Sequence, residues 1–168
     1  MCDKGFGGIL ADEMGLGKSV QLIALLLSRY QRNTGEMGDG SLGPSLIVCP
    51  ASLVYNWGAE FTKFAPSFNA VVVAGTKAER RTAIGRAFRA DEPTVLITSY
   101  DLLRRDVDDY TANEQRFNVM ALDEAQYIKN HTTKIAKAVK AVAADHRFAL
   151  TGTPIENRLS ELCLLYTS

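Results

Sequence analysis

The sequence lacks the features of disulfide-stabilised, zinc-binding and membrane-spanning proteins. Its cysteines, Cys2, Cys49 and Cys163, are far apart and contain no C-x-x-C pair, which argues against a zinc site and a disulfide framework. No apolar run reaches the roughly 18 residues that a membrane-spanning helix needs. The first residues, MCDKGFGG, also lack the apolar segment of a signal peptide. We therefore expect a cytoplasmic protein.

The chain also lacks a net charge, since 19 Lys and Arg residues balance 19 Asp and Glu residues. The total charge gives no sign of long-range attraction to nucleic acid, although a basic strip on one face is compatible with it. What the chain has is the composition of an ordinary globular protein, with 46% hydrophobic and 23% charged residues. Its 168 residues suffice for a single domain that buries about 70% of its unfolded surface.

Short runs rich in Val, Ile and Leu alternate with helical patterns along the chain. The runs are continuous, as in strands that are buried on both faces of a sheet. They lie at 7–11, 45–49, 70–74, 94–98, 118–122 and 147–150. This alternation predicts an α/β fold of three layers, in which helices cover both faces of a mainly parallel central sheet. Ligands of such folds bind at the carboxyl ends of the strands.

The spacing of apolar residues predicts helices at 18–30, 52–64 and 133–144. In the second helix one apolar stripe is formed by Leu53, Trp57, Phe61 and Phe64. We therefore interpret Trp57 as a core residue rather than a platform for stacking bases. The arginines between residues 80 and 89 are interpreted as part of a solvated face.

The stretch DEMGLGKS, residues 12–19, is similar to a phosphate-binding loop but begins with an unusual residue. The pattern G-x-x-x-x-G-K-[ST] fits Gly17, Lys18 and Ser19, and it places Asp12 where the first glycine belongs. The stretch lies between a predicted strand and a predicted helix, as such a loop must. Aspartate tolerates unusual turns, so Asp12 is compatible with this role. The alternative is a chance Gly-Lys-Ser in a surface turn.

In a working loop, the glycines let the backbone bend around an anion at the helix N-terminus. Lys18 then reaches the terminal phosphates, and the hydroxyl of Ser19 binds Mg²⁺. The predicted nucleotide-binding residues are Asp12, Glu13, Met14, Gly15, Leu16, Gly17, Lys18 and Ser19.

Two carboxylates follow the predicted strand in NVMALDEAQ. Adjacent acids at the end of a buried strand are costly unless a cation or a substrate uses them. A Mg²⁺ ion on the phosphates would give Asp123 a partner, and Glu124 would orient or deprotonate the attacking water. The alternative is an ordinary helix N-cap. We predict Lys18, Asp123 and Glu124 as catalytic residues.

A third candidate site follows the last strand, in ALTGTPIEN. Thr151, Gly152 and Thr153 lie where hydroxyl groups would contact Gln126 or the nucleotide and report its state to a neighbouring element. A simple turn explains the same residues equally well.

Together these stretches resemble the Swi/Snf-like DNA translocases of helicase superfamily two, the chromatin-remodelling-type ATPases. The matching stretches are GGILADEMGLGKSVQ, LIVCPASLVYNW, VLITSYDLL, LDEAQYIKN and ALTGTPIENRLSEL. They occur in the family's order and cover nearly the whole chain. The resemblance implies a RecA-like P-loop NTPase fold, and it makes Asp12 a family trait rather than a sign of a broken loop.

The resemblance also implies ATP and Mg²⁺ as cofactors and double-stranded DNA as a partner. It places Ser52, Thr98 and Ser99 along the DNA, where backbone amides and the hydroxyls of these residues contact phosphates without reading sequence. Gln126 takes the place of the histidine in the family's usual D-E-A-H box, which alters the coupling only in detail. The ending ELCLLYTS departs from the family's pattern, so residues beyond about 162 are expected to be foreign or truncated.

The resemblance makes residues 1–168 the first of two RecA-like lobes, truncated at both ends and without the second lobe of the same polypeptide. The expected function is ATP binding within a double-stranded-DNA translocase or remodeller that hydrolyses ATP when complete; alone, the fragment should be nearly inactive. The alternatives are a lobe of a strand-separating or RNA helicase, and a nonhydrolysing module that docks on DNA or a partner. A translocase would be associated with the nucleoid in a prokaryote and lie in the nucleus of a eukaryote.

Overall fold

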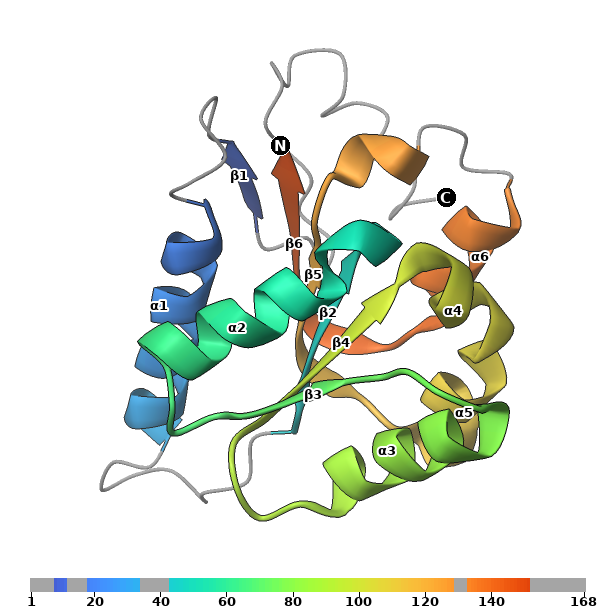
Figure 1. Cartoon of the computed structure of the whole chain (residues 1–168), viewed down its shortest axis with the longest axis horizontal. Coiled ribbons are helices and arrows are strands. Elements are labelled where there is room, and N and C mark those ends of the chain that lie inside the picture. Colours follow the sequence, from blue (N-terminus) through green and yellow to red (C-terminus); the bar gives the residue numbers. More distant parts are fainter. Residues whose placement is uncertain (1–7, 12–17, 34–42, 129–132, 152–168) are drawn as a thin grey trace.

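The computed structural model describes residues 8–11, 18–33, 43–128 and 133–151 (Figure 1). Their six strands form one sheet in the order β1-β6-β5-β2-β4-β3, and each neighbouring pair is parallel. The strands are β1 (Gly8–Ala11), β2 (Ser45–Cys49), β3 (Asn69–Val72), β4 (Thr94–Ser99), β5 (Phe117–Leu122) and β6 (Ala144–Thr151). Each predicted strand is present, and the parallel sheet of the predicted α/β fold is confirmed.

Helices cover both faces of this sheet, which gives the predicted three layers (Figure 1). The α-helices are α1 (Lys18–Asn33), α2 (Val54–Phe64), α3 (Lys77–Arg89), α4 (Tyr100–Arg105), α5 (Val107–Thr111) and α6 (Lys134–Ala141). Short 3-10 helices are η1 (Ala51–Leu53), η2 (Ala112–Glu114) and η3 (Ala125–Ile128). Within the described ranges, none of the helices combines the length and apolar character needed to cross a membrane.

Two apolar clusters form the core, one on each face of the sheet. Successive side chains of a strand point to opposite faces, so Leu46 packs with α3 to α6 and Ile47 packs with α1 and α2. Trp57 and Phe61 of α2 are buried in the second cluster, as the sequence predicts. The prediction that Phe64 continues the apolar stripe into the core is wrong. Phe64 ends the helix and is 40% exposed, because the last turn of α2 leaves the sheet.

Arg80 contradicts the prediction that the arginines of 80–89 lie on a solvated face. Its side chain is only 10% exposed, and its Nε donates to Oδ2 of the fully buried Asp106 at 2.7 Å. Lys77 also contacts Asp106, with 2.7 Å between Nζ and Oδ1. Burial disfavours the charged form of Asp106, but these hydrogen bonds outweigh burial and lower its pKa. The ion pairs thereby tie α3 to the junction between α4 and α5.

Replacing Asp106 with asparagine should lower the free energy of unfolding by about 3 kcal/mol, because Arg80 would remain buried without a counter-charge. Since the pKa of Asp106 is lowered in the folded state, its stabilising effect is complete above its ordinary value of 3.8 and is lost as the pH falls below that value. Urea unfolding at neutral pH and below pH 4 would measure both effects.

The matched control for this substitution is Asp101→Asn, because Asp101 pairs with Arg104 and Arg105 on an exposed surface. Exposed ion pairs contribute little, so this variant should unfold almost like the wild type. Equal unfolding curves for the Asp106 and Asp101 variants would contradict the structural role of the buried pair.

Candidate functional site

Lys18, Asp123 and Glu124 come together at the carboxyl edge of the sheet. Lys18 is the first residue of α1, and the two acids directly follow the buried strand β5. The Nζ atom of Lys18 lies 3.0 Å from Oδ1 of Asp123 and 2.8 Å from Oε1 of Glu124. The side chains of Lys18 and Asp123 are 8% and 4% exposed, whereas that of Glu124 is 28% exposed. Segments far apart in sequence therefore build one charged site that opens to solvent through Glu124.

The charges of this site stabilise one another. Burial alone would lower the pKa of Lys18, but its hydrogen bonds to Glu124 and Asp123 outweigh burial and raise it. The hydrogen bond from Lys18 lowers the pKa of Glu124 against the opposing effect of burial, and Gln126 adds to the lowering. Glu124 is thus a carboxylate at neutral pH, as an acceptor of a proton from water must be.

Asp123 is held in place by hydrogen bonds with four other residues. Trp57 Nε1 donates to its Oδ2 at 2.8 Å, and the amide of Glu124 donates to its Oδ1 at 2.9 Å. The hydroxyl of Tyr100 donates to its backbone carbonyl at 2.7 Å, and its own amide donates to the carbonyl of Val48 on β2 at 2.7 Å. Neither the side chain nor the backbone of Asp123 is free to turn without breaking these bonds.

Glu124 has a left-handed backbone, with a φ of 51°. This conformation is uncommon for a residue other than glycine and costs on the order of 1–3 kcal/mol. It ends the extended course of β5, so that Glu124 and Asp123 both reach Lys18. Gln126 Nε2 donates a hydrogen bond to Oε2 of Glu124. The glutamine of the DEAQ stretch is thus in direct contact with the acid that we predict to act on water.

The structure describes the other predicted nucleotide-binding and coupling residues to different extents. Thr151 is the last residue of β6 and pairs with Ala11 of β1, but its side chain is not described. Ser19 is half-buried in the first turn of α1, next to Lys18. Outside the described residues lie Asp12, Glu13, Met14, Gly15, Leu16, Gly17, Gly152 and Thr153.

The three hydroxyls predicted to contact DNA differ in their exposure. Ser52 is exposed in η1, directly after β2. Ser99 is buried, and its hydroxyl accepts a hydrogen bond from the amide of Leu102 as the N-cap of α4. Thr98 has no exposed surface, because it lies within β4, an inner strand of the sheet. In this conformation only the hydroxyl of Ser52 can meet a phosphate directly, which corrects the prediction for the hydroxyls of Thr98 and Ser99.

The donor set of the site fits Mg²⁺ bound together with phosphates. The ion prefers oxygen ligands and is commonly held by one or two carboxylates plus the phosphates of a substrate. Asp123 supplies the carboxylate, and the ammonium of Lys18 against it shows that the site already favours positive charge. Within the part of the chain that the structure describes, no three His, Cys, Asp or Glu side chains form a metal cluster, so an all-protein metal cage is not supported there.

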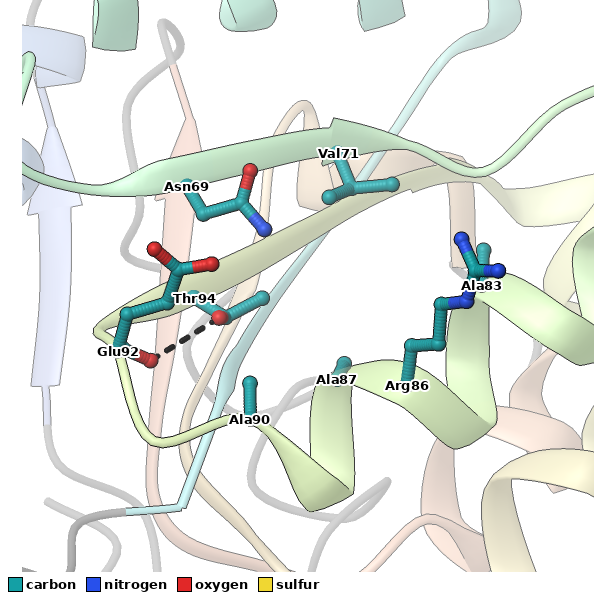
Figure 2. Close-up of a pocket in the computed structure, with 8 residues that line it drawn as sticks. All are labelled: Asn69, Val71, Ala83, Arg86, Ala87, Ala90, Glu92 and Thr94. Atoms are coloured by element: carbon teal, nitrogen blue, oxygen red, sulfur yellow. Dashed lines mark hydrogen bonds between the residues drawn. The ribbon is translucent and has the colours of Figure 1, made fainter.

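A separate pocket of about 350 Å³ lies between α3 and the strands β3 and β4 (Figure 2). Asn69 and Thr94, which line it, are the first residues of their strands, so it opens near the amino ends of β3 and β4. Arg86 and Glu92 supply opposite charges, and the hydroxyl of Thr94 donates to the carbonyl of Glu92 at 3.1 Å. In a parallel sheet this edge is opposite to the one that carries Asp123, so the pocket is distinct from the candidate site.

The fold and the charged site define a nucleotide-binding α/β domain of the P-loop class, and comparison with known proteins gives its family. A model of the SNF2-related domain matches residues 1–167. The chain therefore belongs to the SNF2-related domain family, and the resemblance to Swi/Snf-like ATPases is confirmed.

Relatives and a solved structure agree with this assignment. The chain is 48% identical over 157 residues to an uncharacterized ATP-dependent helicase of Mycoplasma pneumoniae, covering 94% of the chain and 14% of that protein. It is 42% identical over 165 residues to the TATA-binding protein-associated factor MOT1 of Saccharomyces cerevisiae, covering 95% of the chain and 8% of that protein. The SWI2/SNF2 ATPase core of Sulfolobus solfataricus in complex with dsDNA matches with 38% identity and a TM-score of 0.76, over 97% of this chain and 31% of that one.

Proposed function

We propose that this chain is the ATP-binding lobe of an ATP-dependent translocase or remodeller of double-stranded DNA, which hydrolyses ATP when complete. The observation that carries the proposal is the meeting of the Lys18 amine with the carboxylates of Asp123 and Glu124 at the carboxyl edge of the sheet. Membership of the SNF2-related domain family supports the same activity. The chain spans only 14% and 8% of the two curated relatives described above, so the activity proposed is that of a longer protein.

In this proposal each residue of the site has a distinct task. Lys18 releases the carboxylates to hold the terminal phosphates, together with the backbone of the loop at 12–17. Asp123 and Ser19 are the residues that would hold Mg²⁺, which when bound neutralises negative charge on the phosphates. Glu124 orients the attacking water and accepts its proton. Gln126, bonded to Glu124, would transmit the state of the site to residues 151–153.

The complete enzyme needs a DNA surface and a second catalytic face. Exposed Ser52 marks the DNA surface, at the same edge of the sheet as the nucleotide. A second RecA-like lobe of the same polypeptide would close over the nucleotide and supply an arginine, a contribution worth about 10³-fold or more in comparable phosphoryl-transfer enzymes. Opening and closing of the two lobes would then move the pair along a duplex.

The proposal is tested by the ATPase activity of the full-length protein with and without duplex DNA. We expect duplex DNA to raise the rate on the order of tenfold, the size of a typical coupling between two sites. Equal rates would contradict a DNA translocase. Stronger stimulation by single strands, together with unwinding of a tailed duplex, would instead indicate a strand-separating helicase. A lack of heat on titration with Mg-ATP would indicate a module that only docks.

A further inference from the structure

Two aromatic side chains outside the predicted catalytic set hold Asp123 in place. Trp57 donates to its carboxylate at 2.8 Å, and Tyr100 donates to its backbone carbonyl at 2.7 Å. We propose that Trp57 and Tyr100 are positioning residues for Asp123, through which a DNA phosphate backbone lying on the exposed segment after β2 changes ATP turnover at Asp123. This inference rests on the proposed function and adds to it a physical route between the DNA surface and the nucleotide site.

The bond from Trp57 fixes the rotation of the Asp123 carboxylate. One oxygen, Oδ2, accepts from the indole, while the other, Oδ1, accepts from the Glu124 amide and lies 3.0 Å from the Lys18 amine. The indole is 3% exposed and packs at 6.3 Å between ring centroids against Phe61. If α2 moves, the indole moves with it, and the carboxylate must turn or lose its partner in a buried place where water cannot replace it.

The same helix begins at the exposed segment after β2. η1 carries Ser52 and is closed by a hydrogen bond of 2.9 Å from the amide of Leu53 to the carbonyl of Pro50. α2 starts at the next residue, Val54, and Trp57 is in its first turn. A displacement of Ser52 on DNA binding would therefore also displace the indole of Trp57, because only about one turn of helix separates the two residues.

Tyr100 holds the backbone of Asp123 from the segment after β4. It is the first residue of α4 and directly follows Ser99, the N-cap of that helix. Its side chain is buried and crosses to the carbonyl of Asp123 at the end of β5. β4 is not adjacent to β5 in the sheet, since β2 lies between them. The hydroxyl thus links two strand ends that backbone pairing does not join.

Both aromatic rings also fill space in the core, and the two effects separate by substitution. Phenylalanine at either position keeps an aromatic ring in the core but removes the N–H or O–H that Asp123 accepts. For matched controls, Phe61→Leu alters packing beside Trp57, and Tyr110→Phe removes a hydroxyl from another buried tyrosine, on α5. Neither control removes a donor to Asp123.

The experiment measures the ATPase activity of the full-length protein, as kcat and KM with and without duplex DNA, for Trp57→Phe, Tyr100→Phe and both controls. A second measurement gives the Kd for duplex DNA with and without a nonhydrolysable ATP analogue, because coupling between two ligands must appear from either side. We expect the ratio of DNA-stimulated to basal kcat to fall about fivefold or more in each aromatic variant, with a similar loss of the effect of the analogue on DNA binding. The controls should keep both ratios.

Unchanged ratios in both aromatic variants, or an equal loss in the controls, would overturn the inference. If Trp57→Phe fails to fold, Tyr100→Phe decides the question, since it removes one oxygen atom and leaves the ring. The result for the wild type separates the two proposals. A wild type without DNA stimulation refutes the proposed function and the route with it, whereas a stimulated wild type with equally stimulated variants refutes only the route.

Discussion

The variant Glu124→Gln should bind ATP as the wild type does and hydrolyse it about 10²- to 10⁴-fold more slowly, the range contributed by a positioned general base. Glutamine keeps the size of the side chain and an oxygen that can accept from Lys18. It cannot take a proton from water. The lowered pKa of Glu124 means that the wild-type group is already ionised at neutral pH, so the whole effect should be visible there.

Single-turnover hydrolysis by the full-length protein, together with calorimetry of Mg-ATP binding, would separate chemistry from affinity. Glu60→Gln on α2 is the matched control, because it makes the same chemical change in a half-buried residue that lies outside the site. Normal turnover by the Glu124 variant would show that another residue activates the water.

The variant Lys18→Ala should weaken nucleotide binding by about 100-fold or more, because truncating one member of a buried charged pair costs several kcal/mol. The loss has two parts in this structure. The phosphates lose a cation, and the carboxylates of Asp123 and Glu124 lose the amine that lies within 3.0 Å of both. The pKa of Glu124 should consequently rise toward its ordinary value of 4.5.

Calorimetry with Mg-ATP would measure this loss in the full-length protein, and Lys134→Ala supplies the control, since Lys134 is an exposed lysine at the start of another helix, α6. Similar affinities for the Lys18 variant and the wild type would remove Lys18 from the binding site. The stretch at 12–19 would then be a chance match to the phosphate-binding pattern.

The strands could be predicted from sequence because they are buried on both faces. A run such as SLIVC at 45–49 has no polar residue facing solvent, and β2 occupies the same residues. The pairing of Arg80 with Asp106 could not be predicted in this way. Arg80 lies among other charged residues on a helix, which is the pattern of a solvated face. The acid with which it pairs, Asp106, lies 26 residues further along the chain. Only the packing of α3 against the α4–α5 junction brings the two together.

The convergence of Lys18 with the acidic pair followed from motif order and from the rule that parallel strands end at one edge. What sequence reasoning missed was the hydrogen bonding of Trp57 and Tyr100. Periodicity placed Trp57 in the core, which is correct, but it does not give the direction of the indole N–H. A usable signal existed, since a buried tryptophan generally needs an acceptor for that hydrogen. The burial of Thr98 agrees with its place in the apolar run 94–98, and it is the DNA contact of its hydroxyl, implied by the family resemblance, that the structure contradicts.

The indole that donates to Asp123 belongs to the only tryptophan of the 168 residues. Tryptophan fluorescence from these residues therefore comes from a single ring, which is in direct contact with a carboxylate of the candidate site. Emission from an indole shifts when the charge beside its N–H changes. These 168 residues thus carry an optical reporter at Asp123 without any added dye.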